Sequence, residues 1–83
     1  MAHNVQHPVI NWTSANLQTE WKRFQQHAEL MFQGPLHSHT EERKCAFLLI
    51  WVGDVGREIY SAWNLSAEDS KKLNVLLENF NEH

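Results

Sequence analysis

The amino-acid sequence predicts an all-α fold, a small bundle of about four helices with an extended N-terminal arm. Apolar residues recur at intervals of three and four in separate stretches, the spacing of one buried helix face. No stretch after Trp12 alternates apolar and polar residues as a half-buried strand would. The chain has 83 residues, 42% of them hydrophobic, with four Trp, four Phe and one Tyr. That content suits one core and leaves no room for a second. We therefore expect an arm over residues 1–13 and one helical domain over residues 14–83.

The arm has no helical period and contains Pro8, which favours an extended conformation in the residue before it. Its apolar side chains include Val9, Ile10 and Trp12. Burying apolar surface stabilises by roughly 25 cal/mol per Å², whereas ordering a residue costs roughly 1–2 kcal/mol. Because the two terms are close, we expect the arm to dock on a neighbouring molecule or a ligand and to be mobile without one.

The first helix is predicted to begin near residues 14–16, where Ser and Asn can cap the first free N–H groups. It is predicted to end at Gly34 and Pro35, because glycine can take a left-handed cap and proline cannot continue a helix. Its apolar stripe consists of Leu17, Trp21, Phe24, Ala28 and Met31.

The second helix is predicted to start at a capping box from Ser38 to Glu41, or at Thr40, and to stop at Gly53. The side chains of its expected buried face are Cys45, Leu48, Leu49 and Val52. Further apolar residues widen this surface around most of the helix, namely Ala46, Phe47, Ile50 and Trp51. A helix that is apolar nearly all round is normally the most buried one. We therefore expect Leu48 and Trp51 at the centre of the fold.

The third helix is predicted to run from Asp54, as its N-cap, to Trp63. Its expected stripe consists of Val55, Ile59, Ala62 and Trp63. Before and within its first turn, Gly53 and Gly56 predict a left-handed cap or a close approach between helices.

The fourth helix is predicted to begin at Ser66, as a cap, with Glu68 and Asp69 in its positive first turn. Its inward side chains are expected to be Leu73, Leu76, Leu77 and Phe80.

Charge and composition exclude several classes of partner. The formal net charge is −3 and only seven residues are Lys or Arg, so we expect no nucleic-acid partner through this domain. The single cysteine, Cys45, excludes an internal disulfide and fits a reducing compartment. The apolar stretch 46–52 is far too short to span a bilayer, and residues 1–11 do not have the pattern of a signal peptide. We expect a cytoplasmic or otherwise intracellular domain without a membrane partner.

No group of residues indicates catalysis or a cofactor. His37, His39 and Cys45 would give a zinc ion three ligands where four are usual, and Cys45 falls on the buried face of its helix. The glycines at 53 and 56 have neither the preceding strand nor the Lys-Ser/Thr pair of a phosphate-binding loop. The paired carboxylates 41–42 and 68–69 lie where helix N-termini favour negative charge. We therefore expect no enzyme, no catalytic residue, no cofactor and no metal.

The order of the motifs resembles a known family. The motifs are Trp21-Lys-Arg-Phe24, Glu41-Glu42, the run from Leu48 to Gly53 followed by Gly56, Ile59-Tyr60 with Trp63, and Leu73 to Phe80. In this order and spacing they resemble the amino-terminal capsid lobe of Gag polyproteins from gypsy-type long-terminal-repeat retrotransposons. The likeness extends to Gag-derived cellular proteins such as the activity-regulated cytoskeleton-associated protein, and it covers residues 17–80. A zinc knuckle, a protease triplet and a second capsid lobe are absent from this sequence.

The resemblance implies a helical lobe that assembles with copies of itself into capsid-like shells through contacts that are weak one by one. The resemblance implies that polar residues on the helix surfaces make these contacts, and the candidates are Gln18, Gln25, Arg43 and Arg57. The alternative implied by the cellular relatives is a module that binds short peptides. The candidate contacts of its groove are Val9, Ile10, Trp12 and Trp63, with Trp12 and Trp63 expected to be partly exposed.

A third hypothesis is an unrelated helical DNA-binding domain. It needs a basic recognition helix, and the third and fourth helices offer only Arg57, Lys71 and Lys72.

Overall fold

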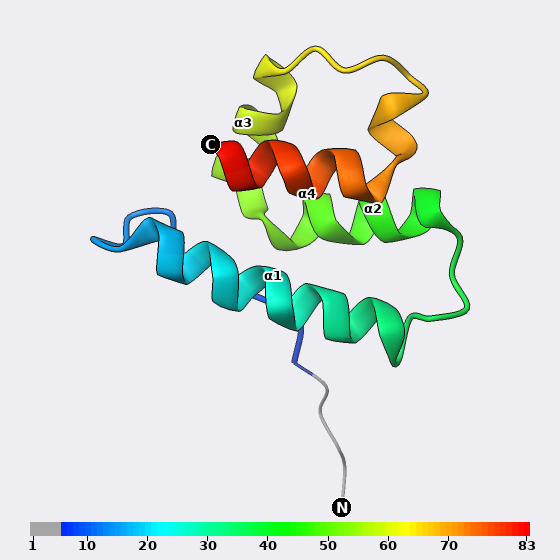
Figure 1. Cartoon of the computed structure of the whole chain (residues 1–83), viewed down its shortest axis with the longest axis horizontal. Coiled ribbons are helices and arrows are strands. Elements are labelled where there is room, and N and C mark those ends of the chain that lie inside the picture. Colours follow the sequence, from blue (N-terminus) through cyan, green and yellow to red (C-terminus); the bar gives the residue numbers. More distant parts are fainter. Residues whose placement is uncertain (1–5) are drawn as a thin grey trace, which may run out of the picture.

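The computed structural model describes residues 6–83 (Figure 1). These residues form four α-helices and one short 3-10 helix, and no strand occurs among them. The elements are α1 (Leu17–Gln33), α2 (Glu41–Trp51), α3 (Gly53–Ala62), η1 (Asp69–Lys71) and α4 (Leu73–Glu82). The predicted all-α bundle is confirmed.

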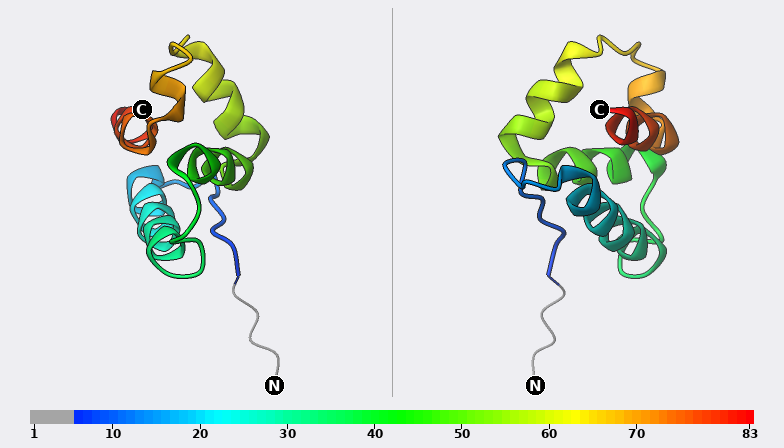
Figure 2. Two further views of the ribbon diagram at one scale, coloured as in Figure 1. Left: turned by 90° about the vertical axis from the view of Figure 1, so that its right-hand side faces the viewer. Right: turned by 60° about the vertical axis from the view of Figure 1, so that its left-hand side comes forward.

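Helix α2 is the central element of the bundle. It contacts α3, α4 and η1, and α1 and α4 lie on one side of it with α3 on the other (Figure 2). The core that joins these elements consists of Ile10, Trp21, Phe24, Ala28, Phe32, Cys45, Leu48, Trp51, Val52, Leu76 and Phe80.

The buried face of α1 follows the predicted stripe for Trp21, Phe24 and Ala28. At its C-terminal end the buried residue is Phe32 and not Met31, which is half-buried. The reason is that the ring of Phe32 stacks on the ring of Trp51 from α2, with their centroids 5.3 Å apart. The contact with α2 therefore determines that Phe32, and not Met31 beside it, is buried.

Both ends of α1 are closed by local hydrogen bonds. At the start, the side chain of Asn16 accepts from the Thr19 N–H at 3.3 Å, as the predicted start requires. At the end, Gly34 N–H donates to the Leu30 carbonyl oxygen at 2.9 Å, but its φ is −103°. The predicted left-handed cap at Gly34 is therefore wrong. The Gly34 N–H continues the helical hydrogen-bond pattern, so the chain leaves α1 without a left-handed residue.

Helix α2 starts at the second of the two predicted caps. Thr40 Oγ1 accepts from the Arg43 N–H at 3.3 Å. Leu48 is completely buried, which confirms its central position. Trp51 is buried nearer the margin of the core, where its ring packs against Phe32 and Phe47. Leu49 was expected on the buried face and is half-buried.

The corner between α2 and α3 uses both glycines in the predicted way. Gly53 has a φ of +75°, in the left-handed region that favours glycine. Gly56 is buried, and a Cβ at this position would collide with the Val52 side chain and lie 3.1 Å from Trp12 Cζ2. Asp54 does not cap α3; it lies in the first turn, where its Oδ1 pairs with Arg57 Nη2 at 2.6 Å.

The outer half of the fold departs most from the predicted pattern. Val55 is 48% exposed and Ala62 is also exposed, so the expected stripe of α3 is wrong at these two positions. Helix α3 packs mainly on α2, and a helix with one neighbour buries only a narrow face. Gly56 is the one buried residue within it.

Helix α4 begins at Leu73, seven residues after the predicted cap. Ser66 Oγ accepts from the Asp69 N–H at 3.0 Å and so stabilises the start of η1 instead. The start of α4 is held from elsewhere, because the Leu73 N–H donates to Glu41 Oε2 at 2.9 Å. Leu76 and Phe80 are buried as predicted, and Leu73 and Leu77 are half-buried.

The arm docks on its own chain. Pro8 and Ile10 are buried, and Trp12 Nε1 donates to the Val52 carbonyl oxygen at 2.8 Å. Val9 between them is 71% exposed. The structure therefore differs from the expectation of an arm that docks only on a neighbour or a ligand. Residues 1–5 of the predicted arm lie outside the described residues.

Candidate functional site

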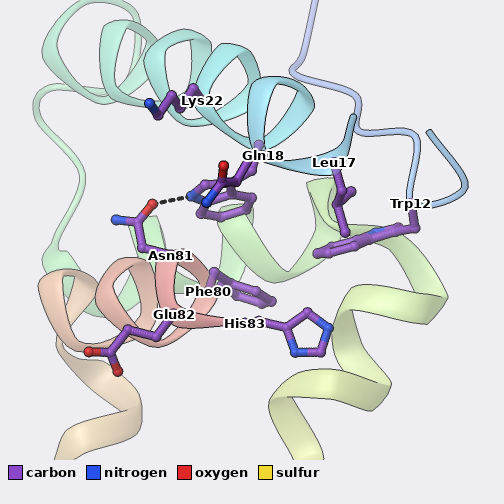
Figure 3. A pocket seen from close by; sticks show the side chains of 9 residues that line it. Trp12, Leu17, Gln18, Lys22, Phe80, Asn81, Glu82 and His83 are labelled. Atoms are coloured by element: carbon purple, nitrogen blue, oxygen red, sulfur yellow. Dashed lines mark hydrogen bonds between the residues drawn. The ribbon is translucent and has the colours of Figure 1, made fainter. Parts of the chain in front are cut away.

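A hollow of about 260 Å³ lies between the start of α1 and the end of α4, with Trp12 of the arm at one end (Figure 3). We call it the aromatic groove. The residues that line it are Trp12, Leu17, Gln18, Trp21, Lys22, Phe80, Asn81, Glu82 and His83.

Three aromatic rings from three separate segments form the apolar part of the groove. The ring centroids of Trp21 and Phe80 are 5.1 Å apart, and that of Trp12 lies 6.5 Å from Trp21 and 6.2 Å from Phe80. Both indole N–H groups are satisfied within the chain: Trp21 Nε1 donates to Asn81 Oδ1 at 2.5 Å, and Trp12 Nε1 donates to the Val52 carbonyl. The rings are therefore held in place before any ligand arrives.

Polar side chains surround these rings. Gln18 and Lys22 come from α1, and Asn81, Glu82 and His83 come from the end of α4 (Figure 3). The His83 ring stands edge-on to Trp12, with a centroid distance of 6.3 Å. An apolar floor with a few polar groups at its edge is the usual composition of a ligand site.

The structure brings only one of the four candidate groove residues into this hollow. Trp12 lines it, whereas Ile10 is 8% exposed and belongs to the core. Val9 is exposed on the arm. Trp63 is half-buried, as expected, but packs edge-to-face on Phe80 at 4.7 Å and does not line the groove.

Several residues of the groove were not expected from the sequence. Lys22 of α1 and the polar end of α4 line the same hollow only through the tertiary fold, which helical periodicity does not reveal. One sequence signal does point there: a buried Trp21 needs a partner for its N–H, and Asn81 directly follows the inward Phe80.

A second candidate surface is the exposed side of α2. Arg43, Ala46 and Ile50, spaced three and four residues apart, are all exposed, and we call them the α2 outer face. Ile50 is 65% exposed, and Phe47 and Leu49 beside it are half-buried. The expectation that α2 is covered nearly all round is therefore wrong on this side.

Arg57 of α3 is occupied within the chain. Its Nη1 donates to the Leu49 carbonyl at 2.8 Å, and its Nη2 pairs with Asp54. It thereby satisfies a carbonyl group that the end of α2 leaves free. The other three candidate assembly contacts are on helix surfaces: Arg43 on the α2 outer face, exposed Gln18 in the lining of the groove, and half-buried Gln25 on α1.

The titratable groups form no shared site in the described residues. Burial raises the pKa of the Cys45 thiol to about 11, and the negative charges of Glu41 and Glu42 act in the same direction. His37 Nδ1 lies 2.9 Å from the Gly34 carbonyl oxygen, and His39 packs edge-on against Phe47. Within residues 6–83 no three His, Cys, Asp or Glu side chains are placed to share a metal ion.

A comparison of the chain with protein families, with curated proteins and with solved structures finds no match. In the part of the chain that the structure describes, every helix is too short or too polar to cross a bilayer.

Proposed function

We propose that this domain acts through protein–protein contacts, as a Gag-type capsid lobe that self-associates into capsid-like shells. The observation that carries the proposal is the α2 outer face. Helix α2, at the centre of the bundle, leaves Ile50 65% exposed between half-buried Phe47 and Leu49. Contiguous exposed apolar surface marks interaction sites, whereas a single exposed apolar side chain is common on any protein. The resemblance to Gag capsid lobes is what favours assigning Ile50 and its half-buried neighbours to such a surface.

The size of this face supports weak association. Burying one isoleucine side chain yields roughly 1.5–3 kcal/mol, while association costs at least about 4 kcal/mol in lost translational and rotational freedom. One such contact therefore gives at most a loose complex. Contacts of this kind become effective when many of them are linked in one assembly. The order of motifs along the chain, which resembles that of Gag capsid lobes, supports the same function.

The role is structural and not enzymatic. It needs no cofactor, metal ion, nucleic acid or membrane, and it places the domain inside the cell, where the thiol of Cys45 stays reduced. Val55, in the first turn of α3, is another exposed apolar side chain, at 48% exposure.

The test is to replace Ile50 with Asp and to measure self-association by sedimentation velocity up to about 1 mM, where a weak contact is populated. We expect concentration-dependent association of the unmodified chain and weaker association, with smaller assemblies, of Ile50→Asp. Val9→Asp is the matched control, because it places the same charge at an apolar residue that is 71% exposed on the arm. Equal association of all three proteins would contradict the role of the α2 outer face.

A second candidate function is favoured by the aromatic groove, which would suit a peptide-binding module. Its rings are fixed by two indole hydrogen bonds, and its volume of about 260 Å³ fits one or two side chains of an extended peptide. Polar groups at the edge, such as the side-chain amides of Gln18 and Asn81, are placed to form hydrogen bonds with a peptide backbone.

Selection from phage-displayed random peptides tests this second candidate. Peptides that bind the unmodified domain are expected to lose binding to Gln18→Trp, because the larger side chain fills the groove. Gln26→Trp, on the same helix but outside the groove, is expected to bind them normally. Equal binding to both variants would show that the peptides occupy another site.

A further inference from the structure

One long face of α1 is polar and open to solvent. Six residues form it, and we call them the α1 polar face: Gln18, Lys22, Gln25, Gln26, Glu29 and Gln33. At 3.6 residues per turn they fall within an arc of about 100°. Each is exposed or half-buried. A shallow hollow of about 290 Å³ runs along five of them, and Leu30, 60% exposed, adds apolar surface at its edge.

The residue types on this face are symmetric about its midpoint, between Gln25 and Gln26. Gln18 and Gln33 lie at equal distances from that point in the sequence, and so do Lys22 and Glu29. If a second α1 lies antiparallel to the first, with a two-fold axis at the midpoint, Lys22 of each copy faces Glu29 of the other. Each glutamine then faces a glutamine, whose amide both donates and accepts hydrogen bonds. The face is complementary to itself.

The two charges of the face have no opposite charge within their own helix. The residues three and four positions from Lys22 are Gln18, Thr19, Gln25 and Gln26, and those from Glu29 are Gln25, Gln26, Phe32 and Gln33. None of these supplies the usual pairing partner on a helix surface. Among residues 6–83 the ion pairs are Arg57–Asp54 and Lys72–Asp69. Neither Lys22 nor Glu29 forms an ion pair within these residues, although Glu82 lines the same hollow as Lys22, and Lys44 the same hollow as Glu29.

We propose that the α1 polar face is a two-fold contact between two copies of this chain, with the two α1 helices antiparallel. This proposal rests on the proposed self-association and specifies one of its contacts. A two-fold contact uses the same patch on both subunits and closes at a dimer. The α2 outer face is a different patch, so the two contacts together join dimers into larger assemblies.

Charge reversal tests the pairing. Lys22→Glu or Glu29→Lys places like charges opposite each other twice in each dimer, and each change is expected to weaken dimerisation at least about tenfold. The double variant Lys22→Glu/Glu29→Lys restores both pairs, and its dissociation constant is expected to return to within about threefold of the original. Arg23→Glu is the matched control, since it makes the same change in charge one residue along α1 and off the polar face.

Disulfide trapping tests the antiparallel register. A mixture of Gln18→Cys and Gln33→Cys chains is expected to form a mixed disulfide under mild oxidation. Gln18→Cys alone should not, since its two copies would lie about 22 Å apart along the helices. The buried Cys45 thiol, with its raised pKa, stays unreactive.

The outcomes separate this contact from the proposed function. Failure of the double variant to restore dimerisation, or cross-linking of Gln18→Cys with itself, would overturn the two-fold contact. Association that is lost in Ile50→Asp but unchanged in Lys22→Glu would overturn it too, while leaving the proposed self-association intact. A chain that remains monomeric at about 1 mM would overturn both proposals.

Discussion

Steric constraints determine the residue type at two positions of the α2–α3 corner. Gly53 adopts a backbone conformation that disfavours any side chain, and Gly56 leaves no space for one between Val52 and Trp12. Both constraints were predictable, because a glycine pair at a helix corner has few other uses. The position of Arg57 was not predictable, since its bond to the Leu49 carbonyl requires the chain to turn back across that corner.

Gly56→Ala is expected to lower the free energy of unfolding by about 1–3 kcal/mol, the usual cost of overpacking a buried site. The added methyl group must displace Val52 or Trp12, whose Cζ2 would lie 3.1 Å away. Gly53→Ala is expected to cost about 1 kcal/mol through its positive φ alone, with open space around the new methyl group. Urea denaturation followed by fluorescence measures both. Unchanged stability of Gly56→Ala would contradict the close packing at this corner.

Cys45 gives the protein a pH dependence in the alkaline range. Its pKa is raised from 9.0 to about 11 because burial disfavours the thiolate. In the unfolded chain the thiol ionises near its ordinary pKa, so above about pH 9 the unfolded state loses a proton that the folded state keeps. The free energy of unfolding is thus expected to fall between about pH 9 and about pH 11, with no such contribution below pH 9. Cys45→Ala should lack this component, and parallel pH profiles for the two proteins would contradict it.

At the scale of the elements, the periodicity of apolar residues identified α1 and α2 and the buried face of α4. It failed where a boundary depends on a distant residue. Helix α4 starts at Leu73 because Glu41, 32 residues earlier, accepts its N–H. It also failed for α3, where Val55 has the right spacing for burial but is 48% exposed, with no element of residues 6–83 covering it.

Trp51 links α2 to α1 by stacking on Phe32. Trp51→Ala is expected to lower the free energy of unfolding by about 3–5 kcal/mol, because its ring packs on Phe32 and Phe47. Ile50→Ala, one residue earlier on the same helix and 65% exposed, should change it by less than about 0.5 kcal/mol. Thermal and urea denaturation of the two variants check the difference. Similar stability of both would mean that the buried face of α2 is assigned wrongly.

For the whole molecule, the sequence could not predict how segments far apart in the chain meet. The aromatic groove depends on two such contacts. The Trp12 indole N–H donates a hydrogen bond to the carbonyl of Val52, 40 residues away. The Trp21 indole N–H donates one to the side chain of Asn81, 60 residues away. Helical periodicity contains no information on such pairings, and for that reason the groove was predicted correctly only at Trp12. The α1 polar face, by contrast, can be found from the sequence once the limits of the helix are known.

The docked arm contributes the buried side chain of Ile10 to the core. Ile10→Ala is expected to lower the free energy of unfolding by about 2–4 kcal/mol, as for a buried residue, because only 8% of Ile10 is exposed. Val9→Ala, its neighbour at 71% exposure, should change it by less than about 0.5 kcal/mol. An arm that needs a partner to dock would make both changes equally harmless in the isolated domain. Denaturation at a low protein concentration distinguishes the two results.

The position of Trp12 has an optical consequence. Its ring centroid is 6.5 Å from that of Trp21, and two indoles this close couple their electronic transitions. The circular dichroism of the domain therefore contains a signal from the pair in addition to that of the helices. Release of the arm would remove that signal, while Trp51, which packs on Phe32 and Phe47, would stay unchanged. The protein thus has a built-in spectroscopic reporter for the position of its arm, with no added label.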